Sequence, residues 1–133
     1  LSDLGASNVV TTGNLKLDAP APPAEPRALA ELQNAIDRRP VIAAASTHAG
    51  EEEAVIEAHS RLRRNFPGLL TVIAPRHPER GPGIADVATG AGLPVALRSR
   101  GELPERETEI YVADTVGELG LIYRMAPAVF IGG

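Results

Sequence analysis

The fold of this chain is decided by residues 111–123, YVADTVGELGLIY, where an apolar run gives way to a polar turn and then to a helical pattern. Residues 110–113 are expected to form a buried strand, because they are apolar and lead into turn-forming residues. Thr115, with Glu118 three positions later, matches a capping box at the start of a helix over 116–125. A strand-to-helix turn of this kind presents backbone N–H groups at the positive end of a helix dipole, so we expect it to bind an anion.

The composition limits the classes of protein to consider. The chain has 133 residues, 44% of them hydrophobic, which is enough for one core, so we expect a single domain or a piece of a larger protein. A net charge of −4 argues against a nucleic-acid partner, which would need a basic face. The absence of cysteine excludes disulfides and thiol chemistry, and the histidines have no metal-ligand spacing, so we expect no metal and no cofactor. No apolar run approaches the roughly 20 residues of a membrane-spanning helix, so the piece itself is expected to be soluble.

Beyond residue 26, apolar runs alternate with polar turns and helical patterns. The expected strands are 41–45, 69–74, 94–97, 110–113 and 128–131, and the expected helices are 27–39, 50–66, 83–91 and 116–125. In helix 50–66, the residues expected to face the core are Val55, Ala58, Leu62 and Phe66. Uninterrupted apolar strands that alternate with helices indicate an α/β fold whose parallel sheet is covered on both faces.

Residues 1–26 are expected to lie outside this α/β unit. An extended segment over 8–18 is followed by residues 19–26, which hold four prolines in eight positions and therefore favour extended chain over helix. We interpret residues 1–26 as an interdomain strand with a proline-rich linker, and residues 27–133 as the α/β domain.

Right-handed crossovers restrict how five parallel strands can be ordered, and they predict the order 3-2-1-4-5. In that order the connections change direction between the first and fourth strands, and ligands bind over the carboxyl ends of the strands at such a point. The candidates for a binding site are therefore the residues that follow the first, second and fourth strands: Ser46, Thr47, His48, Pro75, Arg76, His77 and residues 114–118.

Each candidate also has an ordinary structural explanation. Ser46 and Thr47 can cap the helix that follows them. Arg76 lies between two prolines, and surface charge explains it as well as anion binding does. His48 and Lys16, taken alone, match exposed side chains of no special role. A G-x-G-x-x-G turn and a P-loop are both absent from the sequence, which argues against a dinucleotide-binding site or a P-loop site.

Four blocks of the sequence, taken in order, resemble one known family: GNLK at 13–16, ASTHAGEE at 45–52, PRHPER at 75–80, and DTVGELGLIY at 114–123 followed by FIGG at 130–133. Together they are similar to the carboxyl-terminal half of the Kdo transferases. Those enzymes move 3-deoxy-D-manno-octulosonic acid (Kdo) from CMP-Kdo to the lipid A precursor during lipopolysaccharide synthesis. The resemblance covers nearly the whole chain.

The resemblance implies a GT-B type glycosyltransferase with two Rossmann-like halves, of which this chain is the half that binds the nucleotide sugar CMP-Kdo. It implies that CMP is contacted by Pro75, Arg76, Val116, Gly117 and Glu118. It also implies that Lys16 stabilises the transition state as CMP leaves. Possible additional contacts are Ser46, Thr47, His48, His77, Asp114 and Thr115.

Other parts of such an enzyme are expected outside this chain. The resemblance implies that the acidic catalytic base, the pocket for the lipid A precursor and the membrane-binding surface belong to the amino-terminal half. It places the full-length enzyme at the cytoplasmic face of the bacterial inner membrane. Because the chain stops at Gly133, before the family's glycine-rich loop, we expect an incomplete domain that is inactive alone. Two alternatives stay open: a non-catalytic nucleotide-binding α/β module, and half of a UDP-sugar epimerase or of another glycosyltransferase that uses UDP.

Overall fold

A computed structural model describes residues 22–133 of the chain. Lys16, the expected strand near residue 10 and most of the proline-rich linker therefore lie outside the described residues. In chain order the elements are α1 (Pro26–Ile36), β1 (Val41–Thr47), α2 (Glu51–Leu62), β2 (Leu70–Pro75), η3 (Pro78–Arg80), α3 (Gly81–Gly90), β3 (Val95–Leu97), η4 (Arg98–Arg100), β4 (Ile110–Val112), α4 (Leu119–Met125) and β5 (Val129–Ile131). Within the described residues, each of the five expected strands and four expected helices is present, with shifted ends.

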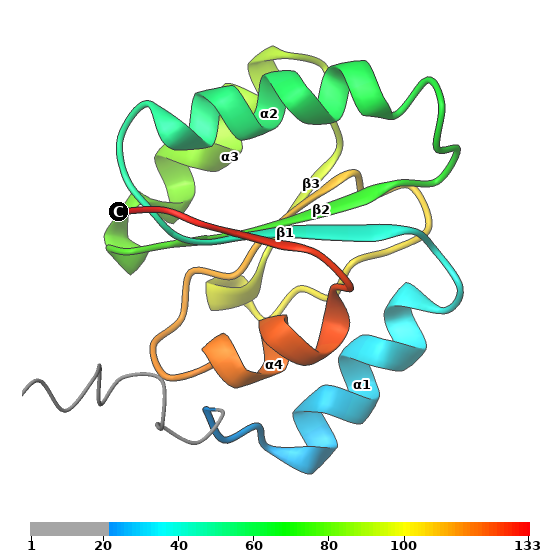
Figure 1. Ribbon diagram of the computed structural model, residues 1–133, viewed down its shortest axis with the longest axis vertical. Helices are drawn as coiled ribbons and strands as arrows, with labels where there is room; N and C mark the ends of the chain where they lie inside the picture. Colours follow the sequence, from blue (N-terminus) through cyan, green and yellow to red (C-terminus); the bar gives the residue numbers. More distant parts are fainter. Residues whose placement is uncertain (1–21) are drawn as a thin grey trace, which may run out of the picture.

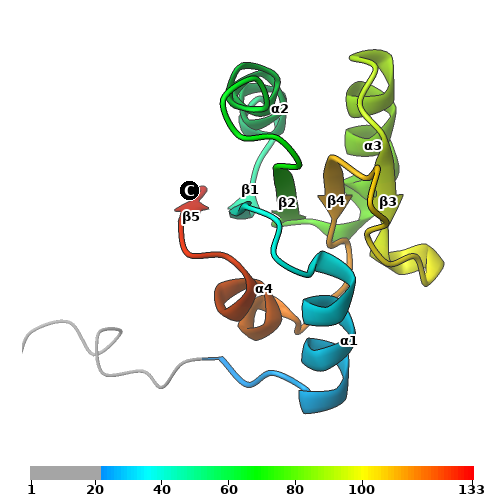
Figure 2. The same ribbon diagram turned by 90° about the vertical axis from the view of Figure 1, so that its right-hand side faces the viewer.

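The molecule has three layers, with the sheet in the middle. Helices α2 and α3 cover one face, and α1 and α4 cover the other (Figures 1 and 2). All strand pairs are parallel, and the order across the sheet is β3-β4-β2-β1-β5. The prediction of an α/β fold with a parallel sheet covered on both faces is confirmed.

The predicted strand order 3-2-1-4-5 is wrong in the placement of β4. This strand pairs with β3 and with β2, so that Ile110 lies opposite both Val95 and Thr71. Residues 98–109, which join β3 to β4, contain only the short η4 and a loop. A connection of about a dozen residues is near the minimum for two adjacent parallel strands, and it brings β4 in beside β3 rather than across the sheet to β1. The segment that contains α4 is longer, and it crosses from β4 over the sheet to β5, which pairs with β1.

In this order, the connections between strands change direction between β2 and β4, and not between the first and fourth strands as predicted. The helix after β2 is α3, on one face of the sheet, whereas the helix after β4 is α4, on the other face (Figure 2). The strands β2 and β4 are neighbours, so the crevice in which ligands of α/β sheets bind lies between their carboxyl ends.

Two cores hold the layers together, one on each face of the sheet. Successive residues of a strand point to opposite faces. Val72 accordingly belongs to the core under α1 and α4, with Leu32 and Leu121, whereas Ile73 belongs to the core under α2 and α3. Within residues 22–133, no helix is both long enough and apolar enough to cross a bilayer.

Helix α2 turns a different face to the sheet from the expected one. Its buried residues are Glu52, Ile56 and His59, and the expected core residue Phe66 lies beyond the helix end and is 50% exposed. The hydrophobic pattern misled the prediction because two of the three buried positions are polar. His59 lies between the Thr71 hydroxyl (2.8 Å) and the Glu109 carboxylate (3.0 Å).

Two other helix ends differ from the prediction. Helix α1 ends at Ile36 rather than near Arg39, because Asp37 has a positive φ of 53° and so leaves the helical conformation. Helix α4 begins at Leu119 rather than at 116, and its N-cap residue is Glu118, whose side chain makes no capping hydrogen bond. The predicted capping box is therefore wrong: the Thr115 hydroxyl donates to the Glu118 carboxylate, not to the backbone.

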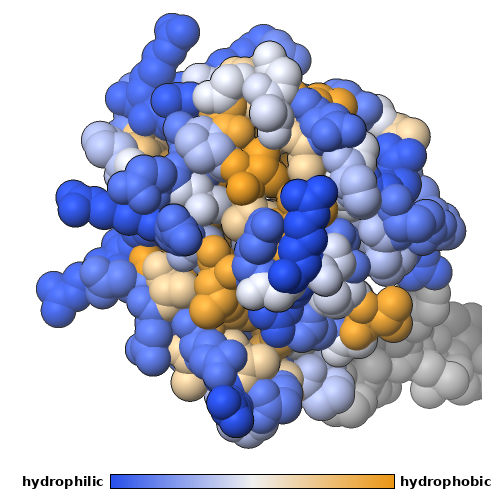
Figure 3. Space-filling model, turned by 180° about the vertical axis from the view of Figure 1, so that it is seen from behind, coloured by the Kyte–Doolittle hydropathy of each residue, from blue (hydrophilic) through white to orange (hydrophobic). Residues whose placement is uncertain are grey.

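Parts of the surface are apolar. A groove of about 310 Å³ lies beside α2 and is lined by Ile42, Ala43, Ala44, Glu51, Ala54, Val55, Ala58, Thr71 and Phe130. The back of the molecule, where β3 forms the edge of the sheet, is mostly hydrophilic, with hydrophobic side chains gathered in a broken band across its middle (Figure 3).

Candidate functional site at the carboxyl end of the sheet

A cavity of about 160 Å³ lies at the carboxyl ends of β1, β2 and β4, where the topology places the crevice. Its lining residues are Ser46, Ala74, Pro75, Arg76, Pro78, Ala113, Thr115, Val116, Gly117, Leu119 and Ile122. Four of the five residues predicted to contact CMP therefore lie around one space, together with Ser46 and Thr115. Glu118, Thr47, His48, His77 and Asp114 are not part of its lining.

The end of β1 is irregular next to this cavity. Ser46 has a φ of 56°, a left-handed conformation that is uncommon for residues other than glycine, and the pairing of β1 with β2 shifts register between Ala45 and Thr47. Such a bulge redirects a side chain at the end of a strand. Thr47, the next residue, is buried, and its hydroxyl donates to Glu52 (3.1 Å). Its carbonyl accepts a hydrogen bond from the backbone N–H of Arg76 (2.8 Å).

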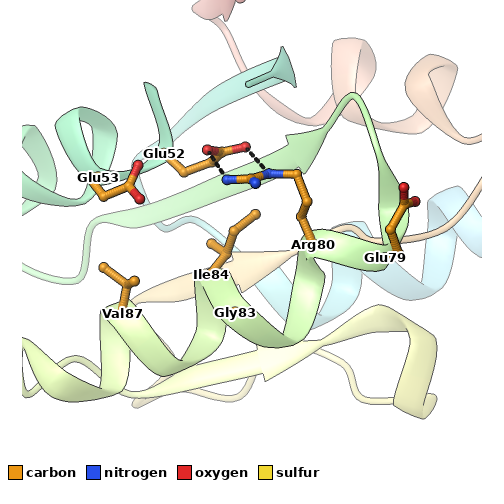
Figure 4. A pocket seen from close by; sticks show the side chains of 7 residues that line it. All are labelled: Glu52, Glu53, Glu79, Arg80, Gly83, Ile84 and Val87. Atoms are coloured by element: carbon orange, nitrogen blue, oxygen red, sulfur yellow. Dashed lines mark hydrogen bonds and ion pairs between the residues drawn. The ribbon is translucent and has the colours of Figure 1, made fainter. Parts of the chain in front are cut away.

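The turn after β2 carries Arg76 and His77, and both side chains are exposed. Among the described residues, no side-chain hydrogen bond or ion pair is formed by the Arg76 guanidinium, so its charge is available to a ligand. His77 lies edge-on to His48, which follows β1, with ring centroids 6.4 Å apart. The turn continues into η3, whose last residue, Arg80, binds the carboxylate of Glu52 (Figure 4).

Asp114, the second residue after β4, forms hydrogen bonds within the protein. Its carboxylate accepts hydrogen bonds from the backbone N–H (2.8 Å) and the hydroxyl (2.6 Å) of Ser99. The same carboxylate lies against Gly81, the first residue of α3, where a Cβ atom would overlap it. Asp114 thus joins the segments that follow β3 and β4 to the start of α3, and the residue is 6% exposed.

Glu118 is bound by an arginine that sequence reasoning missed. The carboxylate accepts hydrogen bonds from Nε and Nη2 of Arg98, both 2.6 Å long. These bonds, with a smaller contribution from the Thr115 hydroxyl, hold the pKa of Glu118 below its usual range although partial burial opposes the shift. Arg98 also lies 3.4 Å from the Tyr111 hydroxyl. The one signal in the sequence was its position directly after a strand, which it shares with Arg76.

The anion site expected at a helix N-terminus takes a different form. Val116 and Gly117 precede α4, which has seven residues, and they belong to the turn rather than to the first turn of the helix. Gly117 has a φ of 85°, a conformation that glycine adopts without strain. Val116 is 85% exposed, so the turn presents its backbone and an apolar side chain to the crevice.

Several known proteins are similar to this chain in sequence. No protein-family model matches it. It is 33% identical over 132 residues to a 3-deoxy-D-manno-octulosonic acid transferase of Rickettsia felis, and the aligned residues cover 99% of this chain and 28% of that protein. It is 37% identical over 123 residues to the enzyme of the same name from Haemophilus influenzae, with 92% of this chain and 29% of that protein covered. The chain thus spans less than a third of the length of these relatives.

A solved structure agrees with the sequence matches. The crystal structure of the C-terminal CMP-Kdo binding domain of WaaA from Acinetobacter baumannii superposes with a TM-score of 0.73 at 32% identity, over 80% of this chain and 56% of that chain. This agreement confirms the expected Rossmann-like domain of the type that forms one half of a GT-B enzyme. In sequence this chain is similar to the 3-deoxy-D-manno-octulosonic acid transferases, and in structure it is similar to a C-terminal CMP-Kdo binding domain.

Proposed function

We propose that the protein containing this chain transfers Kdo from CMP-Kdo to a lipid A precursor in lipopolysaccharide synthesis, and that residues 27–133 bind the CMP-Kdo donor. The names of the similar proteins support this proposal. The acceptor site, the acidic base and the association with the cytoplasmic face of the inner membrane would belong to parts of the protein outside this chain. Residues 1–26 would then connect the two halves.

The observation that carries the proposal is the cavity between the ends of β1, β2 and β4, which brings together residues from separate sequence blocks of the family resemblance. At about 160 Å³ it is smaller than the roughly 300 Å³ at which pockets for whole small molecules begin. It would therefore take only part of CMP-Kdo. That size is expected of a domain that forms one wall of a cleft between two halves.

The chemistry of the lining supports a nucleotide donor. Departure of CMP leaves negative charge on its phosphate, and a guanidinium in a poorly hydrated cleft stabilises such charge more than it would in water. Arg76 is the exposed cation at the cavity, and the backbone of Val116 and Gly117 would contribute N–H donors. Lys16 would stabilise the same developing charge. Glu118, although bound by Arg98, retains lone pairs that can accept hydrogen bonds from a ribose hydroxyl or from the cytosine amine.

The proposal is tested by titrating the ¹⁵N-labelled chain with CMP and, separately, with UMP and NAD. We expect CMP to bind weakly and to shift the amide signals of Ser46, Arg76, Thr115 and Gly117, with smaller effects from UMP. Shifts confined to the amino end of the sheet would contradict the proposal. A clear preference for UMP would favour a UDP-sugar enzyme. In the longer protein, binding of CMP-Kdo without release of CMP, even with the lipid A precursor present, would favour a module that binds the nucleotide without catalysis.

A further inference from the structure

The first turn of α2 carries a buried carboxylate close to the candidate site. Glu52 is 1% exposed, and it accepts hydrogen bonds from Arg80 through Nη2 (3.0 Å) and Nε (3.3 Å). Figure 4 shows Arg80 reaching back from the turn after β2 to meet Glu52 on α2. A third hydrogen bond comes from the Thr47 hydroxyl at the end of β1 (3.1 Å). One carboxylate therefore connects three segments.

These hydrogen bonds close a ring around the turn that carries Arg76. The backbone N–H of Arg76 donates to the carbonyl of Thr47 (2.8 Å), so one residue, Thr47, binds both Arg76 and Glu52. At the other end of the turn, Arg80 is held by Glu52 and its own N–H donates to the carbonyl of His77 (3.0 Å). The turn is thus fixed at its first and last residues, and Arg76 extends from it without a side-chain partner among residues 22–133.

Stability alone explains this arrangement poorly. Removing a carboxylate from water is costly, and replacement of buried ion pairs by apolar side chains is often neutral or stabilising. A buried pair with additional hydrogen bonds does, however, restrict the geometry of the segments it joins. Because the direction of the Arg76 side chain depends on the backbone of residues 76–80, the contact at Glu52 determines where that charge is presented.

We propose that Glu52 is a positioning residue, which holds the turn at residues 76–80 so that Arg76 is preorganised to meet the phosphate of the nucleotide. This inference rests on the proposed function of the cavity. It assigns Glu52 no contact with the ligand: its oxygens are directed to Thr47 and Arg80. Preorganisation of this kind raises affinity by removing the cost of ordering a charged group on binding.

The test is a double-mutant cycle measured as CMP affinity by NMR titration. We expect Glu52→Gln to weaken CMP binding roughly three- to thirty-fold, which lies within the range of coupling between residues in contact. In an Arg76→Ala background the same change should have almost no further effect, because the group that Glu52 positions is already gone. Equal losses in both backgrounds would show that Glu52 does not act through Arg76 and would overturn the inference.

Two controls on the same helix separate positioning from other effects. Glu57→Gln removes an exposed carboxylate whose one ion pair among residues 22–133 is with Arg61, so CMP affinity should not change. His59→Gln disturbs a buried polar residue that contacts Thr71 and Glu109 rather than the turn. It should lower the melting temperature but leave CMP affinity unchanged. A loss of affinity in His59→Gln equal to that in Glu52→Gln would mean that reduced stability explains both.

The variant Arg80→Lys, studied by amide hydrogen exchange without ligand, tests the inference independently of CMP binding. Arg80→Lys keeps a positive charge beside Glu52 but cannot donate two hydrogen bonds in the fork geometry of arginine. In this variant, exchange of the backbone amide hydrogens of residues 76 and 80 should become at least tenfold faster, while exchange in β2 stays unchanged. Unchanged exchange at Arg76 would contradict the inference. If the wild-type chain fails to bind CMP but the exchange result holds, the proposed ligand is wrong and the role of Glu52 in fixing the turn stands.

Discussion

Arg98 binds Glu118 in a bidentate manner, with hydrogen bonds of 2.6 Å from Nε and from Nη2 to the two carboxylate oxygens. The two residues follow adjacent strands, β3 and β4, and lie 20 positions apart in the sequence. Their side chains are 18% and 26% exposed, so solvent screens this pair less than an ion pair on the open surface. The pair fixes one end of the turn at residues 114–118, which forms part of the candidate site.

The first prediction concerns the pH dependence of stability. The hydrogen bonds from Arg98 hold the pKa of Glu118 below its ordinary value. A lowered folded-state pKa means that the stabilisation is fully present above about pH 4.5, the unfolded-state pKa, and is lost as the pH falls through the folded-state pKa. We expect Glu118→Gln to lower the free energy of unfolding by about 1 kcal/mol at pH 7. This difference from wild type should shrink below about pH 4.

Urea unfolding of both proteins at pH 7, 5, 4 and 3 measures this difference. The control is Glu31→Gln, which removes a carboxylate whose side chain is 51% exposed and which pairs with an arginine that is itself 86% exposed. Its effect should stay within a few tenths of a kcal/mol at every pH. A constant difference between wild type and Glu118→Gln from pH 7 to pH 3 would show that ionisation of Glu118 contributes nothing.

The second prediction concerns Arg76. A hydrogen bond to a charged group contributes on the order of 1.5–3 kcal/mol, so Arg76→Ala should weaken CMP binding or lower activity of the longer protein at least tenfold. The melting temperature should change little, because the guanidinium is exposed and has no side-chain partner among the described residues. Arg64→Ala, which removes an exposed arginine after α2, is the matched control and should bind CMP normally. An Arg76→Ala variant with full affinity would assign this residue to ordinary surface charge.

The third prediction compares two glycines of α3. A Cβ at Gly81 would overlap the Asp114 carboxylate, whereas a Cβ at Gly83 meets nothing within 4 Å. Gly81→Ala should therefore lower the free energy of unfolding by roughly 1–3 kcal/mol. Gly83→Ala should raise it by about 0.5–1 kcal/mol, because alanine favours the helix. Thermal unfolding measures both, and equal effects of the two changes would contradict the close packing of Asp114 on α3.

The fourth prediction concerns Lys16, which lies outside the described residues. If Lys16 stabilises charge that develops only as CMP leaves, Lys16→Ala in the longer protein should lower turnover far more than it weakens ground-state binding of CMP. Steady-state kinetics combined with a CMP titration separates the two. Parallel losses would indicate uniform binding. No change in either would show that the role implied by the family resemblance does not apply to Lys16.

Local patterns explain what could be read from the sequence alone. The five strands are short apolar runs bounded by turn residues, a signal that depends on neighbouring residues only. The candidate residues Pro75, Arg76, Val116 and Gly117 were found because they lie in the turns after such runs, and parallel strands bring their carboxyl ends to one edge. Their presence around one cavity follows from this rule. The prediction that they lie together is therefore confirmed, although the predicted strand order is wrong.

The order of the strands and the inward face of α2 were decided by tertiary structure. The strand order depends on the path of residues 98–109, and no local pattern shows whether such a segment crosses the sheet or returns beside the strand it left. The face of α2 depends on partners far along the chain: Arg80 lies 28 positions from Glu52, and Glu109 lies 50 positions from His59. From the sequence alone, a polar residue of a helix is predicted to be exposed, because the distant partner that allows its burial is not known. The sequence therefore determined the class of fold and which turns carry the candidate residues, whereas the pairings Arg98–Glu118 and Arg80–Glu52 that fix those turns exist only once distant segments are packed together.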